Sequence, residues 1–109
     1  ISEIAVLVKK SKPKFTNVTK DAVIAAVCKQ FSLKAEALLG ASRKQNLMFP
    51  RQVVMFLLRK HMGLTLSEIG EVCGGRDHST VIHAISKVER LMVEGGVMKD
   101  NVLRTESSL

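Results

Sequence analysis

The stretch that decides the fold reads Gly74-Gly75-Arg76-Asp77-His78-Ser79-Thr80-Val81-Ile82-His83-Ala84. Its two glycines supply the positive φ angles of a sharp reversal, and Asp77 is a favoured residue type for capping a helix. We therefore predict a helix that begins near Arg76 to His78 and ends at Gly95. Apolar residues recur along it at the spacing of one helical face. The residues of this predicted core face are Val81, Ile85, Val88 and Met92, with Ile82 and Leu91 at its edges.

A second helix is predicted immediately upstream of this turn. Residues 65–68 read Thr-Leu-Ser-Glu, the form of a capping box, so a short helix should start at Thr65, run through Ile69 and Val72, and stop at Gly74. A short helix, a glycine turn and a longer helix make a helix-turn-helix, whose second helix enters the major groove of DNA. Because many helical hairpins with glycine turns bind nothing, this segment alone leaves both interpretations open.

Composition and charge indicate one helical domain with a polyanionic partner. The chain has 109 residues, 46% of them hydrophobic, and strand-like alternation is hard to find, so an all-α fold follows. Lys and Arg outnumber Asp and Glu by 17 to 10, and the formal charge of +7 suits double-stranded DNA. Although scattered lysines are usually only solvated, two stretches are one-sidedly basic. These are Lys9, Lys10, Lys12, Lys14 and Lys20 near the N-terminus, and Arg43, Lys44, Arg51, Arg59 and Lys60 in a run without acids.

The N-terminal segment is predicted to be a linker. Apolar residues share one helical face over residues 1–10, and the sequence Ser-Lys-Pro-Lys then breaks the pattern. We assign residues 1–17 to the end of a linker helix and a basic hinge, and residues 18–109 to a small helical bundle that contains the helix-turn-helix. The first helix of the bundle should start near Thr19, capped by Thr19 or Asn17.

The remaining helices are predicted from the residues that typically start or end a helix and from their apolar patterns. Ser32 should cap a short helix that Gly40 ends, and residues 41–48 should form a loop. Pro50 suits the first turn of the next helix, which is the most apolar of the chain and runs to Met62. A short closing helix is suggested by Val97, Met98, Val102 and Leu103.

Several function classes find little support. Cys28 and Cys73 fit neither a disulfide framework nor a zinc site and should be small buried residues in a reducing compartment. We see no signal peptide and no apolar run long enough to span a bilayer, so we expect a cytoplasmic protein. The one cluster of metal-ligand types in the sequence is Cys73, Asp77, His78 and His83. Its histidines are five residues apart, and the order of its residues matches no recognised ligand spacing. Without a Gly-Lys-Ser/Thr phosphate loop either, no enzyme activity and no cofactor are expected.

A DNA-binding surface needs phosphate contacts for affinity and base-edge contacts for sequence. Asp77 could accept from a cytosine or adenine amino group, or act only as a helix cap. His78 can donate or accept, and the hydroxyl group of Ser79 can meet a base edge. Other residues of this helix suit phosphate contacts or simple exposure to solvent, namely Thr80, His83 and Lys87.

Two further basic segments suit a DNA partner. Arg43 and Lys44 lie in the predicted loop, and a loop arginine can enter a narrow minor groove, although exposed loop cations are common. Arg51 and Gln52 lie in the first turn after Pro50, where unpaired amides and the helix dipole favour a phosphate.

These residues together resemble the C-terminal DNA-binding domain of the DnaA family, the bacterial chromosomal replication initiators. The resemblance covers roughly residues 18–109 and implies a bundle of six helices that binds DnaA boxes at the replication origin. It also implies a nucleoid location, regulatory proteins as further partners, a monomer for this chain alone, and ATP binding only in an AAA+ domain that precedes this segment. Its motifs are residues 74–84 with Lys87-Val88, Pro50-Arg51-Gln52, Leu66-Ser67-Glu68-Ile69-Gly70 and Ser42-Arg43-Lys44.

Carried over position by position, the resemblance implies that Asp77, His78 and Ser79 read bases in the major groove and that Arg43 reads the minor groove. Ser79 stands where many members have Thr, and Ser67 replaces a frequent Pro. A helix-turn-helix transcription regulator and a helical protein-interaction module, which would use exposed apolar residues, are the alternatives. The implied phosphate contacts are Lys44, Arg51, Gln52, Arg59, Leu66, Ser67, Arg76, Thr80, His83 and Lys87.

Overall fold

A computed structural model describes residues 18–41 and 44–109 of the chain. This part is all helical, as predicted, with no strand. The predicted linker and hinge of residues 1–17 lie outside it, as does Arg43. In chain order the helices are α2 (Lys20–Phe31), α3 (Ala35–Leu39), α4 (Gln45–Leu57), the π-helical turn η1 (Leu58–Met62), α5 (Leu66–Val72), α6 (His78–Glu94) and α7 (Val97–Ser107).

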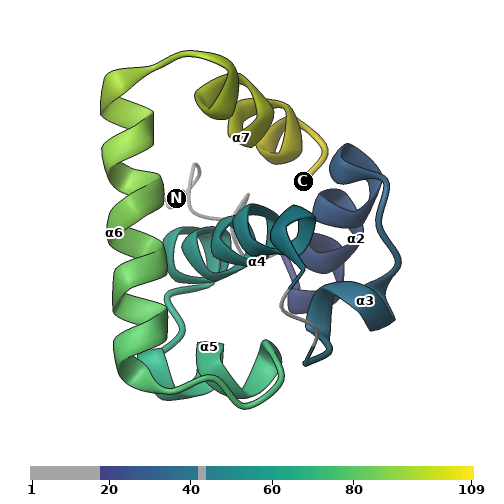
Figure 1. Ribbon diagram of the computed structural model, residues 1–109, viewed down its shortest axis with the longest axis vertical. Coiled ribbons are helices and arrows are strands. Elements are labelled where there is room, and N and C mark those ends of the chain that lie inside the picture. Colours follow the sequence, from purple (N-terminus) through teal and green to yellow (C-terminus); the bar gives the residue numbers. More distant parts are fainter. Residues whose placement is uncertain (1–17, 42–43) are drawn as a thin grey trace, which may run out of the picture.

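Helix α4 forms the centre of the bundle, as its apolar sequence predicts. It packs against α2, α3 and α6, and α6 runs along one side of the molecule past both α5 and α7 (Figure 1). Val53, Val54 and Leu57 have no exposed surface, so α4 has no free apolar face to offer a partner in its middle.

The start of α4 differs from the prediction. The helix begins at Gln45 rather than Pro50, so Pro50 lies inside it. A proline in a helix interior costs about 3 kcal/mol because it has no N–H and crowds the preceding turn. Burial of Leu47 (3% exposed) and the edge-to-face contact of Phe49 with Phe31, at 5.9 Å between ring centroids, offset this cost by a similar amount, about 2–4 kcal/mol.

The caps of α2 and α3 were predicted with mixed success. The Thr19 hydroxyl accepts from the Ala22 N–H at 3.1 Å and caps α2, while Asn17 lies outside the described residues. Ser32 was wrongly predicted to start α3. It ends α2 instead, in a left-handed conformation with φ 55°, and its N–H donates to the Cys28 carbonyl. Lys34 precedes α3 without a side-chain cap bond.

Helix α6 has the predicted bounds but not the full predicted core, and the predicted closing helix is present as α7. Val81, Ala84 and Val88 of α6 are buried, whereas Ile85 and Met92 are only half-buried. Of the four apolar residues that suggested this closing helix, Val102 alone is buried, together with Thr105. The apolar residues of α7 left exposed are Val97, Met98 and Leu103.

Cys73 is buried and Cys28 is half-buried, and both are free thiols. Burial raises the pKa of Cys73 to about 11, so this thiol stays protonated and unreactive near neutral pH. Within the described ranges no helix is both long and apolar enough to cross a membrane.

The early start of α4 can be tested at Leu47. Replacing Leu47 with Ala should lower the free energy of unfolding by about 2–5 kcal/mol, because it empties a packed site. Met48→Ala is the matched control, since Met48 is 45% exposed and should change stability by less than about 1 kcal/mol. Urea denaturation measures both, and equal losses would contradict the docked first turn.

Candidate nucleic-acid interface

The first helix of the helix-turn-helix starts with the predicted capping box. The Thr65 hydroxyl accepts from the Glu68 N–H at 3.1 Å, and Glu68 Oε1 accepts from the Thr65 N–H at 2.8 Å. The hydrogen bonds that Thr65 donates to the Glu68 carboxylate lower the pKa of Glu68 below its ordinary value, because they favour the ionised form. The start of α5 is therefore determined within four residues of sequence.

The turn between α5 and α6 depends on glycine at three positions. Gly74 and Gly75 have φ values of 87° and 81°, as predicted from the sequence. Gly70 is needed for a different reason: its carbonyl accepts from the N–H groups of Gly75 and Arg76, and a Cβ at Gly70 would lie 2.2 Å from the Arg76 carbonyl oxygen. A Cβ at Gly74 would likewise lie 2.4 Å from the carbonyl oxygen of Leu39 in α3. Tight backbone contacts thus hold the turn before α6 against both α5 and α3.

The start of α6 is capped and open to solvent. Asp77 Oδ1 accepts from the Thr80 N–H at 2.9 Å, and the hydrogen bonds to Thr80 lower the pKa of Asp77. His78, Ser79 and Thr80 are exposed in the first turn of the helix. His83 and Lys87, predicted farther along the same helix, are exposed as well. The first turn of α6 therefore presents an imidazole, two hydroxyls and the positive end of a helix dipole.

Arg51 is not at the surface, where a phosphate contact was expected. It is 5% exposed, and its Nε donates to the Leu38 carbonyl at 2.7 Å. Its Nη2 donates to the carbonyls of Ala37 and Gly40, each at 3.0 Å. Burial, and then the charge of Arg76, lowers the pKa of Arg51 from its ordinary value, though not enough to remove its charge. Arg51 lies in the second turn of α4, so it is away from the helix start that was expected to attract the anion.

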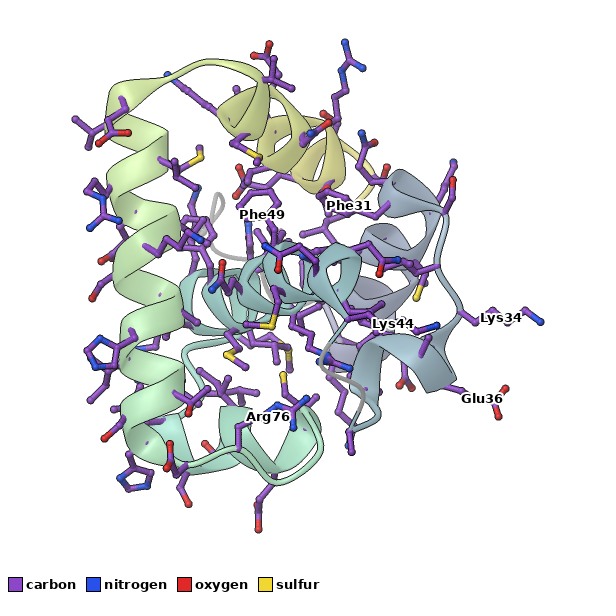
Figure 2. All side chains as sticks on the ribbon, viewed as in Figure 1. Phe31, Lys34, Glu36, Lys44, Phe49 and Arg76 are labelled. Carbon is purple, nitrogen blue, oxygen red and sulfur yellow. The ribbon has the colours of Figure 1, made fainter. Side chains whose placement is uncertain are left out.

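Arg76 is half-buried and bonds to the same part of α3. Its Nη2 donates to the Gly40 carbonyl at 2.9 Å, so two arginines share one oxygen. Figure 2 shows the Arg76 side chain extending from the turn before α6 into the bundle, whereas Lys34, just before α3, and Glu36 of α3 point outward. No sequence pattern indicated Gly40 as a shared acceptor, because the two donors lie 11 and 36 residues away from it.

The other expected phosphate contacts are distributed over three elements. Arg59 is exposed, and its Nη1 donates to the Leu64 carbonyl at 2.7 Å, which places it beside the start of α5. Leu66 is half-buried there. Of the remaining predicted residues, Ser67 and Lys44 are exposed and Gln52 is half-buried.

Fewer cations of the basic run between Ala37 and Ser67 are available to a polyanion than the sequence suggests. Arg51 is bound inside the bundle, and Lys60 pairs with Glu106 of α7 at 2.8 Å. His61 contacts the same carboxylate oxygen at 2.8 Å, and the hydrogen bonds from Lys60 and His61 lower the pKa of Glu106 against the opposing effect of burial. Over residues 18–41 and 44–109, no group of three or more His, Cys, Asp or Glu side chains is arranged to hold a metal ion.

Comparison with known proteins identifies the relatives of this helix-turn-helix. A family model described as the bacterial dnaA protein helix-turn-helix matches residues 20–88. The chromosomal replication initiator protein DnaA of Thermomicrobium roseum is 40% identical over 91 residues, which is 84% of this chain and 20% of that protein. The protein of the same name from a Synechococcus species is 41% identical over 81 residues, or 74% of this chain and 17% of the relative. The one from Thermus thermophilus is 46% identical over 69 residues, or 63% of this chain and 16% of the relative.

The glycine requirement at the turn can be tested by two matched substitutions. Gly70→Ala should lower the free energy of unfolding by about 3 kcal/mol, because its Cβ collides with backbone that has no room to move. Gly63→Ala adds a Cβ in open space and should cost only the left-handed strain, about 1–2 kcal/mol. Chemical denaturation distinguishes them, and a smaller loss at Gly70 than at Gly63 would contradict the close contact.

Proposed function

Since this chain belongs to the family of the bacterial DnaA helix-turn-helix, whose model matches residues 20–88, we propose that it binds double-stranded DNA in a sequence-specific manner, at DnaA boxes of a replication origin. The chain spans only 16–20% of the length of the relatives compared above, which are replication initiators by name. Its own part in initiation is then to place the initiator on the origin.

The observation that carries this proposal is the exposed first turn of α6 on a rigid support. Base edges are read by the N-terminal residues of the second helix in a helix-turn-helix. His78 and Ser79 are exposed there and supply hydrogen-bonding groups, and Asp77 precedes them. The backbone contacts of Gly70 and Gly74 hold this turn in place, so the side chains meet DNA in one orientation.

Affinity is proposed to come from the exposed polar residues around that turn. Arg59 and Ser67 flank the start of α5, and Thr80, His83 and Lys87 follow along α6. Lys44 directly precedes α4, and Arg43, which lies outside the described residues, is proposed to enter the minor groove. Each phosphate contact adds a salt-dependent contribution that is the same for all sequences.

A protein-interaction module has weaker support. Its apolar candidates Val93 and Val97 are 87% and 75% exposed, but they lie near the end of α6 that is opposite to His78 (Figure 1). Scattered exposed apolar residues are normal in soluble proteins. Such a module would associate without DNA, which light scattering would detect.

The proposal predicts a preference that fluorescence anisotropy can measure. The chain should bind a DnaA-box duplex at least about 10³-fold more tightly than a scrambled duplex of equal length at physiological salt. Equal and steeply salt-dependent binding to both duplexes would reduce the function to non-specific DNA binding. No binding to either would refute a role in DNA binding.

Base reading can be separated from helix capping at Asp77. Asp77→Ser should keep the cap, and therefore the thermal stability, because serine caps as well as aspartate. It should still lose about 1–3 kcal/mol of discrimination between box and scrambled DNA if the carboxylate accepts from a base. Asp77→Ala should lose both, with about 1 kcal/mol of stability. His78→Ala should lose discrimination alone, and unchanged discrimination in all three variants would contradict base reading by this turn.

A further inference from the structure

Two arginines from separate elements meet at the C-terminal end of α3. Arg51 comes from α4 and Arg76 from the turn before α6, and each donates to the Gly40 carbonyl, at 3.0 and 2.9 Å. The last carbonyls of a helix have no partner within the helix and carry its negative dipole end. Two guanidinium groups therefore satisfy both the hydrogen-bonding and the electrostatic demand of the end of α3.

Backbone contacts extend this connection to the turn that precedes α6. The Leu39 carbonyl lies so close to Gly74 that a Cβ there would be 2.4 Å away. Arg76 is the residue directly before the cap Asp77. A shift of the end of α3 would therefore move both the turn and the residue that precedes the first turn of α6.

We propose that Arg51 is a positioning residue for sequence reading, which holds the end of α3 so that Gly40 and Arg76 orient the first turn of α6. This inference rests on the proposed function, because it assumes that the first turn of α6 reads bases. Arg51 acts through the Gly40 carbonyl and not by contact with DNA, since its side chain is buried and bound to three carbonyls.

A positioning role and a phosphate contact differ in what their loss does. Loss of a phosphate contact weakens binding to all DNA equally and lowers the slope of log K against log salt by about 0.9. Loss of positioning weakens binding to the box and leaves scrambled DNA and the salt slope unchanged. The substitution Arg51→Lys distinguishes the two roles further. Lysine keeps the positive charge that a phosphate contact needs, but it has no planar guanidinium group to donate to several carbonyls.

The test measures binding to box and scrambled duplexes at several salt concentrations for Arg51→Lys and Arg51→Gln. Both variants should lose about tenfold or more in affinity for the box, which is the range of one lost base contact, and should bind scrambled DNA as the Arg104→Gln control does. Arg104 is an exposed cation of α7 outside the proposed interface, so it controls for net charge. Circular dichroism confirms that each variant is folded at the temperature of the assay.

Arg76→Lys provides a second route if the Arg51 variants do not fold, because Arg76 is only half-buried. It should show the same box-selective loss, and combining it with Arg51→Lys should add little, since both bond to one carbonyl. A uniform loss with a lower slope in Arg51→Gln that Arg51→Lys rescues would overturn the inference in favour of a phosphate contact. Unchanged box affinity would also overturn it. A wild-type chain without preference for the box would instead refute the proposed function, and this inference with it.

Discussion

The arrangement of this domain depends on a backbone contact that only glycine permits. The carbonyl of Gly70 accepts from two successive N–H groups of the turn, and the carbonyl oxygen of Arg76 lies only 2.2 Å from where a Cβ of residue 70 would be. Because backbone atoms cannot rotate away as side chains do, this contact leaves α6 little freedom relative to α5. This backbone contact therefore sets the orientation of the exposed first turn of α6.

The same turn is also held from the other side of the bundle. Gly74 touches the Leu39 carbonyl, and Arg76 reaches Gly40, so α3 supports the turn although it is distant in sequence. A five-residue helix such as α3 is unstable by itself, since nucleation is costly and few of its hydrogen bonds lie within it. The hydrogen bonds from Arg51 to three carbonyls at the end of α3 supply what this helix lacks, and α3 then serves as a support for the turn before α6.

The positive charge of the chain consequently has two uses. Arg51 satisfies carbonyls in the interior, and Lys60 joins η1 to α7 through Glu106. Exposed cations and polar groups near α5 and α6, such as Arg59 and Lys87, stay available to a polyanion. Net charge is thus in keeping with the proposed polyanionic partner, while it overstates how many cations can meet that partner.

The sequence by itself determined the features that depend on neighbours within about one helical turn. The capping box at Thr65, the Asp77 cap and the reversal at Gly74 and Gly75 were all predicted, because each is a bond or backbone angle set by adjacent residues. Family motifs likewise identified the domain. Contacts between residues that are distant in the sequence could not be predicted from these local patterns. The tertiary structure alone decided that α4 starts before Pro50, since Phe31 and Leu47 stabilise the extra turn. It also decided the contacts of Arg51, because a guanidinium binds whichever unpaired carbonyls the fold brings to it, and those lie at the end of another helix.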